Sequence, residues 1–209
     1  MHHLGVLLQS SVLFRRLLAC NSRVVNSSVR PAYPLLASDH RLRVRCSSTA
    51  GTRVVLGIES SCDDTAAAVV NEAGNILGEA LATQEEVHRQ WGGVVPSLAQ
   101  EAHRLAIDSV VDKAMKAADM KFSDLDAVAY TVGPGLGLCL QVGAAKAKGV
   151  AFEHQLPLVP CHHMEAHALV ARLGDEVKFP FLCMLVSGGH NLLLIVRGIG
   201  DYMQVCCNS

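Results

Sequence analysis

Several patterns that would assign a sequence to a common functional class are missing from this chain of 209 residues. None of its eight cysteines stands in a C-x-x-C pair, which argues against a zinc knuckle or a thioredoxin-like redox site. No apolar run approaches the roughly 18 residues of a membrane span, so we expect no transmembrane helix. Aromatic residues are scarce and do not alternate with a run of Lys or Arg, so the composition indicates no nucleic-acid-binding surface.

The first 50 residues almost lack acidic side chains. They contain seven Arg, no Lys and the single acid Asp39, a balance of +6, whereas residues 51–209 contain 11 basic and 18 acidic residues, a balance of −7. An Arg-rich, Ser-rich segment without acids is typical of a mitochondrial transit peptide. We therefore expect residues 1–50 to be a disordered transit peptide and the protein to lie in the mitochondrial matrix. The alternative is a disordered tail on a cytosolic protein.

A folded domain is expected to begin near Arg53 with three antiparallel strands. These strands are predicted at residues 54–58, 66–70 and 76–83. The turn after the first strand, residues 59–65, is rich in hydroxyl and carboxyl groups. Such a turn can bind a nucleotide phosphate, with Asp63 and Asp64 holding Mg²⁺. The alternative is an ordinary polar turn, which uses the same residue types.

The next segment alternates helices and strands. Pro96 begins a helix whose apolar residues keep helical spacing as far as Met120, with His103 off the apolar stripe. A strand, a second helix and a short strand are expected at residues 127–131, 138–152 and 156–160. The glycine-rich loop 133–137 either cradles a phosphate or is a tight turn that lets the following helix pack closely on the sheet. It lacks the G-K-[ST] of a Walker loop.

His163 and His167 are four residues apart, so on a helix they share one face and can bind one metal ion. The alternative is a His-rich helix without metal, since two ligands do not close a site. A metallopeptidase is disfavoured because the H-E-x-x-H motif needs Glu directly after the first His. Here Glu165 is two residues on and points about 200° away around the helix.

A second hairpin signal follows at residues 181–196. Two apolar strands, 181–186 and 191–196, flank the turn Ser187-Gly188-Gly189-His190. This repeats the order of the first hairpin: an apolar strand, a small hydroxyl-bearing turn and another apolar strand. Two such phosphate-binding hairpins, one in each lobe, are required by an actin-like ATP-binding fold.

Five segments in this order resemble the threonylcarbamoyl transferase family that modifies tRNA, in particular its mitochondrial branch, once called O-sialoglycoprotein endopeptidase-like. They are VLGIESSCDDTAAAVV (54–69), GGVVPSLAQEAHR (92–104), GPGLGLCLQVGAAKAKGVA (133–151), HHMEAHAL (162–169) and FLCMLVSGGHNLLLIV (181–196). The resemblance implies an α/β fold of the actin-like ATPase type (ASKHA, with RNase H-like lobes). It also implies transfer of threonylcarbamoyl from its adenylate to the N6 amine of the adenosine 3′ of the anticodon, in mitochondrial tRNAs reading ANN codons.

The resemblance also implies roles for single residues. His163 and His167 match metal ligands, and Asp63, Asp64 and His190 match catalytic positions, any of which could accept the proton of the amine. The substrate-binding stretch corresponds to Leu185, Val186, Ser187, Gly188 and Gly189. Expected cofactors are one divalent ion per subunit (Zn, Fe or Mg) and ATP or threonylcarbamoyl-AMP. Expected partners are mitochondrial tRNA and a second subunit in a full-length homodimer.

The family continues beyond the end of this chain, with a late Asp that completes the metal site. We therefore expect a complete first lobe at residues 53–178, a second lobe that is only begun by a hairpin at 179–202, and a divergent tail at 203–209. The alternative function is then an inactive truncated isoform. On this interpretation the chain alone should have little activity and exposed apolar strand edges.

Overall fold

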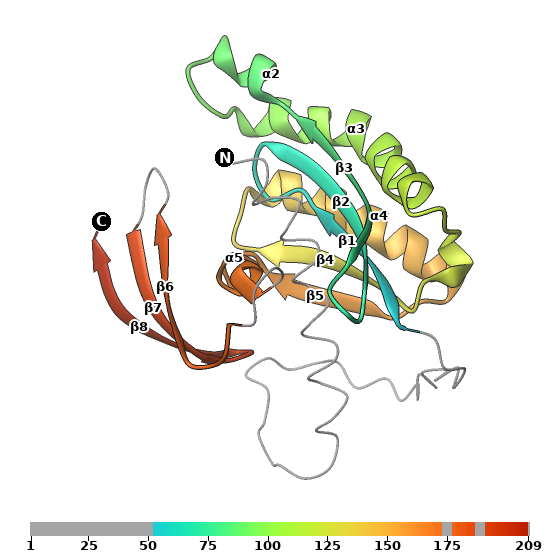
Figure 1. The fold of residues 1–209 in the computed structure, drawn as a ribbon. Helices are drawn as coiled ribbons and strands as arrows, with labels where there is room; N and C mark the ends of the chain where they lie inside the picture. Colours follow the sequence, from blue (N-terminus) through green and yellow to red (C-terminus); the bar gives the residue numbers. More distant parts are fainter. Residues whose placement is uncertain (1–51, 173–176, 187–190, 209) are drawn as a thin grey trace, which may run out of the picture.

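Two β-sheets and the helices packed on them make up residues 52–172, 177–186 and 191–208, the part of the chain that the computed structural model describes (Figure 1). The first sheet has the order β3-β2-β1-β4-β5. Its strands are β1 (Val54–Glu59), β2 (Asp64–Asn71), β3 (Ile76–Thr83), β4 (Ala127–Gly133) and β5 (Leu158–His162). The first three are antiparallel, while β4 runs parallel to β1 and β5 parallel to β4. The predicted actin-like, RNase H-like fold class is confirmed by this arrangement.

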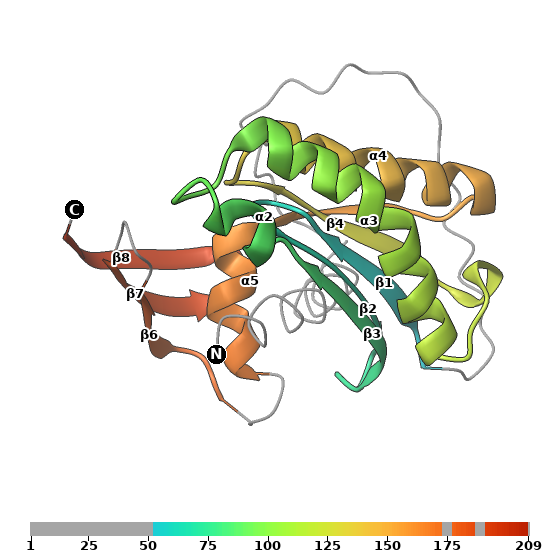
Figure 2. The same ribbon diagram turned by 90° about the horizontal axis from the view of Figure 1, so that it is seen from above.

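The longest helices cover one face of this sheet (Figure 2). They are α3 (Pro96–Ala117), which begins at Pro96 as predicted, and α4 (Gly137–His154). The core between helices and sheet contains apolar side chains such as Leu56, Val69 and Val128. Shorter elements are α2 (Glu85–Arg89), η1 (Phe122–Asp124), α5 (His163–Leu169) and η2 (Val170–Arg172). In the described part of the chain, no helix is long and apolar enough to cross a membrane.

Helix α3 buries the predicted apolar residues Val110, Val111, Ala114 and Met115, but its first half buries a different set from the predicted one. Ala99, His103 and Ile107, which are four residues apart, face the sheet, and His103 has no exposed surface. Leu105, predicted to be in the apolar stripe, is 77% exposed. The prediction that His103 lies off the buried face was therefore wrong. The prediction treated His103 as external because imidazole is polar, although its spacing of four residues from Ala99 and Ile107 indicates an internal position.

The second sheet contains three antiparallel strands in the order β6-β7-β8. They are β6 (Phe181–Val186), β7 (Asn191–Gly198) and β8 (Asp201–Asn208). The expectation of a hairpin alone was wrong, because residues 203–208, expected to be a tail, pair with β7. The turn at Gly200, with a φ of 74°, reverses the chain so that this pairing can form.

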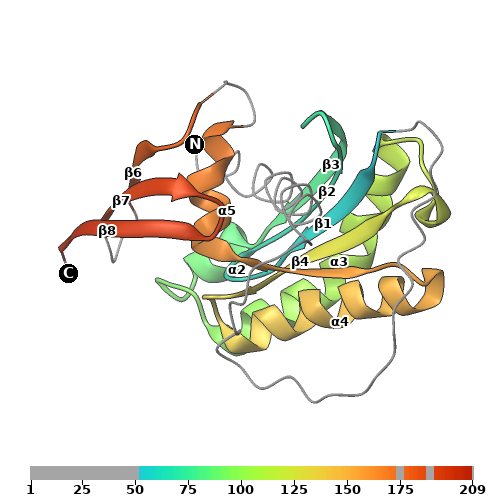
Figure 3. The same cartoon turned by 90° about the horizontal axis from the view of Figure 1, so that it is seen from below.

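Helix α5 lies between the two sheets (Figures 1 and 3). Ala168 and Leu169 on this helix pack with Val196 of β7. On β6 the alternate side chains Leu182, Met184 and Val186 are exposed. One face of the second sheet therefore packs on α5, while β6 exposes apolar side chains on the other face.

Helix α4 approaches the β1–β2 turn very closely at Gly143. The Gly143 backbone N–H donates to Ser60 Oγ over 3.1 Å, and Ser60 Oγ in turn donates to the Cys139 carbonyl over 2.9 Å. A Cβ atom added to Gly143 would collide with Ser60 Oγ. Gly149, six residues further along the same helix, has open space where an added Cβ atom would lie. The packing of α4 on the turn therefore depends on glycine at residue 143.

The same turn is held from α3 by His103. Its Nε2 lies 3.1 Å from the Cys62 carbonyl, which can only accept, so Nε2 carries the proton. Its Nδ1 then accepts from Thr65 Oγ1 over 2.7 Å. Burial lowers the pKa of His103, against the raising effects of the Cys62 carbonyl and the nearby carboxylates. A neutral imidazole thus joins both ends of the turn that contains Asp63 and Asp64.

We predict opposite effects from two alanine substitutions in α4. Gly143→Ala should lower the free energy of unfolding by about 1–3 kcal/mol, because the new methyl group pushes Ser60 out of place. Gly149→Ala should raise it by up to about 1 kcal/mol, since alanine is the better helix former and meets no neighbour. Urea unfolding of both variants measures the difference. Equal effects would show that α4 does not depend on this contact.

We also predict a pH dependence from His103. Its pKa is lowered in the folded chain, so below its ordinary value of 6.5 the unfolded chain binds more protons on this side chain. The free energy of unfolding should therefore fall as the pH drops from about 7 to about 5. His103→Gln should be less stable at neutral pH but should lose part of this pH dependence. The exposed His162→Gln is the control, and an unchanged slope in His103→Gln would contradict the assignment.

Candidate functional site

The site lies where three parallel strands end (Figure 3). Strands β1, β4 and β5 point in the same direction, so residues at their carboxyl ends meet at one edge of the sheet. This edge brings together Glu59, the last residue of β1, Thr131 near the end of β4, and His163, which directly follows β5. Thr131 and His163 follow Glu59 in the sequence by 72 and 104 positions, and the fold makes both of them its neighbours.

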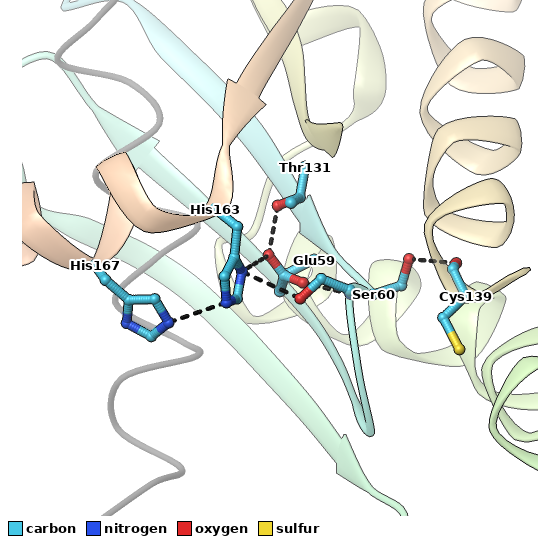
Figure 4. Close-up of polar contacts among 7 residues, drawn as sticks. Glu59, Ser60, Thr131, Cys139, His163 and His167 are labelled. Carbon is cyan, nitrogen blue, oxygen red and sulfur yellow. Dashed lines mark hydrogen bonds and ion pairs between the residues drawn. The ribbon is translucent and has the colours of Figure 1, made fainter. Parts of the chain in front are cut away.

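Glu59 is the most buried charged group of the site, with 2% of its surface exposed. Its Oε1 accepts from the Ser61 backbone N–H, and its Oε2 accepts from Thr131 Oγ1 (Figure 4). His163 Nδ1 lies 3.5 Å from the same Oε2. Burial acts to raise the pKa of Glu59, but His163, Ser61 and Thr131 together outweigh it, so that the pKa is lowered. Glu59 is therefore a carboxylate at neutral pH.

The two histidines predicted to bind metal lie side by side on α5. His163 Nε2 and His167 Nε2 are 3.2 Å apart (Figure 4). Two ligand atoms at about 2.0–2.1 Å from a tetrahedral zinc ion are about 3.3 Å apart, so this pair fits two positions of such a site. Across the described ranges, no group of three or more His, Cys, Asp and Glu side chains could hold a metal ion. The distance between the two nitrogens is thus compatible with two of the four ligand positions around such an ion.

The glycine-rich loop packs directly on the β1–β2 turn. The Leu136 backbone N–H donates to the Ser61 carbonyl over 2.7 Å, and a Cβ atom on Gly135 would collide with Ser61. Ser61 Oγ lies 3.1 Å from His163 Nδ1. Of the two interpretations of this loop, the geometry favours the one in which glycine permits close packing. The loop thereby holds Ser61 against the histidine pair.

The remaining predicted site residues are placed only in part. Asp63 and Asp64 follow Ser61 on the same turn, and both are half-buried. On β6, Leu185 is half-buried and Val186 is exposed. The predicted residues Ser187, Gly188, Gly189 and His190 lie outside the described part of the chain. The structure therefore brings the acidic turn and the histidine helix together at one edge.

No activated thiol is found next to this turn among the described residues. Partial loss of hydration, Asp63 and other neighbouring acidic groups raise the pKa of Cys62 to about 11. Burial likewise raises the pKa of Cys139. Both thiols stay protonated at neutral pH, and thiols react as nucleophiles in the thiolate form. Neither thiol is therefore a candidate nucleophile at this edge of the sheet.

Sequence reasoning missed Glu59, Ser61, Thr131 and His103 as parts of this site. One signal was available for Glu59, because it is a charged residue at the end of a strand that is otherwise entirely apolar and buried. A buried charge needs partners, so such a position predicts a network. Nothing in the sequence near Thr131 indicates which distant side chain it contacts.

Glu165 takes a different role from that of a peptidase base. Its Oε1 accepts from the Gly200 backbone N–H over 2.9 Å and from the Tyr202 hydroxyl over 2.6 Å. These contacts attach α5 to the β7–β8 turn. Glu165 therefore connects the histidine helix to the second sheet, which agrees with the sequence argument against a metallopeptidase.

Comparison with known proteins identifies the family. A family model described as "TsaD: tRNA N6-adenosine threonylcarbamoyltransferase" matches residues 75–208. The chain is 56% identical over 153 residues to a probable tRNA N6-adenosine threonylcarbamoyltransferase, mitochondrial, of Arabidopsis thaliana, covering 73% of this chain and 32% of that protein. It is 52% identical over 151 residues to the mitochondrial tRNA N6-adenosine threonylcarbamoyltransferase of Homo sapiens, covering 72% and 36%.

A solved structure supports the fold independently. YeaZ from Pseudomonas aeruginosa matches with a TM-score of 0.50 at 15% identity, covering 73% of this chain and 66% of YeaZ. The chain spans about a third of the length of the two curated relatives. From the match of the family model over residues 75–208, the chain belongs to the tRNA N6-adenosine threonylcarbamoyltransferase (TsaD) family.

Proposed function

We propose that this chain takes part in transferring a threonylcarbamoyl group from threonylcarbamoyl-AMP to the N6 amine of the adenosine 3′ of the anticodon. The tRNAs would be mitochondrial ones that read ANN codons. Membership of the family supports the reaction class. The names of the relatives from Arabidopsis thaliana and Homo sapiens support a mitochondrial location, and we propose the matrix.

The observation that carries this proposal is the pair of Nε2 atoms 3.2 Å apart on α5, next to the buried Glu59 network. His163 and His167 would hold one divalent ion, Zn, Fe or Mg, through these atoms. When bound, the ion would neutralise the adenylate phosphate and stabilise the oxyanion that forms during acyl transfer. Ligands beyond the two imidazoles are needed to complete the site.

The other proposed roles fall on the two hairpin turns. Asp63 and Asp64 lie on the turn that Ser61 connects to His163 Nδ1, so either carboxylate is suited to accept the proton that the amine loses. His190 stays a third candidate from the sequence. Leu185, Val186, Ser187, Gly188 and Gly189 are proposed to bind the substrate.

The partners are proposed from chemistry and charge. The transfer needs tRNA, yet residues 51–209 have a balance of −7 and no basic run. A surface of this charge repels a phosphate backbone. We therefore propose that most tRNA contacts come from a second subunit of a homodimer or from parts of the family fold outside this chain.

Metal binding gives the first test. Zn²⁺ titration of the chain against a chromophoric chelator should show binding that is lost in His163→Ala and in His167→Ala, because either change leaves a single imidazole. His162→Ala is the matched control, since the adjacent His162 is exposed and should not alter the affinity. Undiminished binding in the double variant His163→Ala/His167→Ala would refute the site.

Transfer gives the second test. The chain is incubated with Zn²⁺, threonylcarbamoyl-AMP and a tRNA reading an ANN codon, and the nucleosides are analysed by mass spectrometry. If the chain by itself supplies the transfer site, threonylcarbamoyladenosine forms and its yield falls at least about 100-fold in His163→Ala/His167→Ala, a loss of roughly 2.7 kcal/mol of transition-state stabilisation. Equal yields would exclude the histidine site. A chain that binds Zn²⁺ but forms no product would be the inactive isoform considered from the sequence.

A further inference from the structure

Glu59 contacts all three chain segments that meet at the site. Its oxygens face the Ser61 backbone N–H on the β1–β2 turn, Thr131 Oγ1 on β4 and His163 Nδ1 at the start of α5. With 2% of its surface exposed, the carboxylate has almost no water as an alternative partner. The orientation of every group around it is therefore set by what a carboxylate can accept.

The position of Glu59 favours one of the two nitrogens of His163 as the proton carrier. An ionised carboxylate attracts an N–H and repels a lone pair, so Glu59 Oε2, 3.5 Å from His163 Nδ1, favours the Nδ1–H form. In neutral imidazole the other nitrogen, Nε2, is then left with its lone pair. Nε2 is the atom that faces His167 Nε2 at 3.2 Å. The buried carboxylate and the histidine pair are thus linked through one imidazole ring.

Ser61 Oγ also contacts Nδ1, at 3.1 Å, but it does not determine the proton position. A hydroxyl group can donate or accept, so it adapts to either form of the imidazole. The same holds for Thr131 Oγ1. Of the two groups that face His163 Nδ1, the carboxylate of Glu59 is the one that can only accept.

We propose that Glu59 is a positioning residue that selects the Nδ1-protonated form of His163 and so presents the Nε2 lone pair to a cation shared with His167. This inference rests on the proposed metal site and extends it to a residue that does not itself bind the cation. A partner of this kind fixes the ring and raises its basicity, and its loss typically weakens metal binding by about 10–100-fold.

Glu59→Gln is the sharpest test because it keeps the shape of the side chain but replaces the accepting oxygen Oε2 by a donating NH₂ group. The Ser61 backbone N–H can only donate, so the amide must turn its oxygen toward Ser61 and its NH₂ toward Thr131 and His163. That NH₂ can only donate. His163 Nδ1 would then have to accept, which moves the imidazole proton to Nε2 and directs it at His167.

The protonation state is measured by long-range ¹H–¹⁵N NMR of the ¹⁵N-histidine-labelled chain at about pH 8, above the ordinary pKa of histidine. The His163 signals are assigned by comparison with His163→Ala. We expect the Nδ1–H form in the wild-type chain and the Nε2–H form in Glu59→Gln. Thr131→Val, which removes a hydroxyl but keeps the carboxylate, is the matched control and should retain Nδ1–H. A wild-type His163 in the Nε2–H form would overturn the proposal even if Glu59→Gln failed to fold.

Zn²⁺ affinity is the second readout. Glu59→Gln should bind Zn²⁺ about 10–100-fold more weakly than the wild type, and Glu59→Asp, which restores a carboxylate, should recover part of the loss. Affinity equal to that of the wild type in a folded Glu59→Gln would refute the positioning role while leaving the metal site intact. A proton shift in Glu59→Gln without any Zn²⁺ binding by the wild type would refute the metal site instead, and with it the positioning of a cation.

Discussion

The architecture of the site depends on one buried carboxylate. A charged group in the interior is costly unless it is fully hydrogen-bonded, and Glu59 meets this requirement only through groups from three different parts of the chain. The β1–β2 turn, the end of β4 and the start of α5 must therefore lie within hydrogen-bonding reach of a single point. The contacts that stabilise the buried carboxylate are therefore the same contacts that assemble the candidate site.

The parallel strands bring these three segments together. Because β4 and β5 run parallel to β1, their carboxyl ends meet at one edge, and α5 starts directly beyond that edge. Gly135 and Gly143 then allow the glycine loop and α4 to approach Ser61 and Ser60 without a side chain in between. His103 supports the same turn from α3. The turn is thus held from several sides by groups that do not take part in the proposed chemistry themselves.

Helix α5 is connected to both sheets, to each through a different side chain. Through His163 it contacts the first sheet, and through Glu165 it contacts Gly200 and Tyr202 at the β7–β8 turn. An apolar face of the second sheet, with Leu182 and Met184, is left exposed in the described fold. The matched segment makes up only about a third of the length of the two curated relatives, so the family fold has further chain to place around these elements.

Much of the fold could be predicted from local pattern. The strand Val54–Glu59, the start of α3 at Pro96 and the shared face of His163 and His167 all follow from apolar runs, proline chemistry and helical spacing. The predictions failed where local chemistry and tertiary position disagree. His103 is polar yet internal, and residues 203–208 read as a tail yet form a strand because β7 offers an unpaired edge.

The sequence by itself determined which residue types carry chemistry here, namely two imidazoles on one helical face and an acidic turn after a buried strand. It also determined the family, since the order of motifs is a property of the chain alone. Only the tertiary structure decided that Glu59, Ser61 and Thr131 surround His163, because these contacts join residues up to 104 positions apart. The reason is physical: a buried charge accepts any donor that the fold brings within reach, and local sequence does not specify which donors those are.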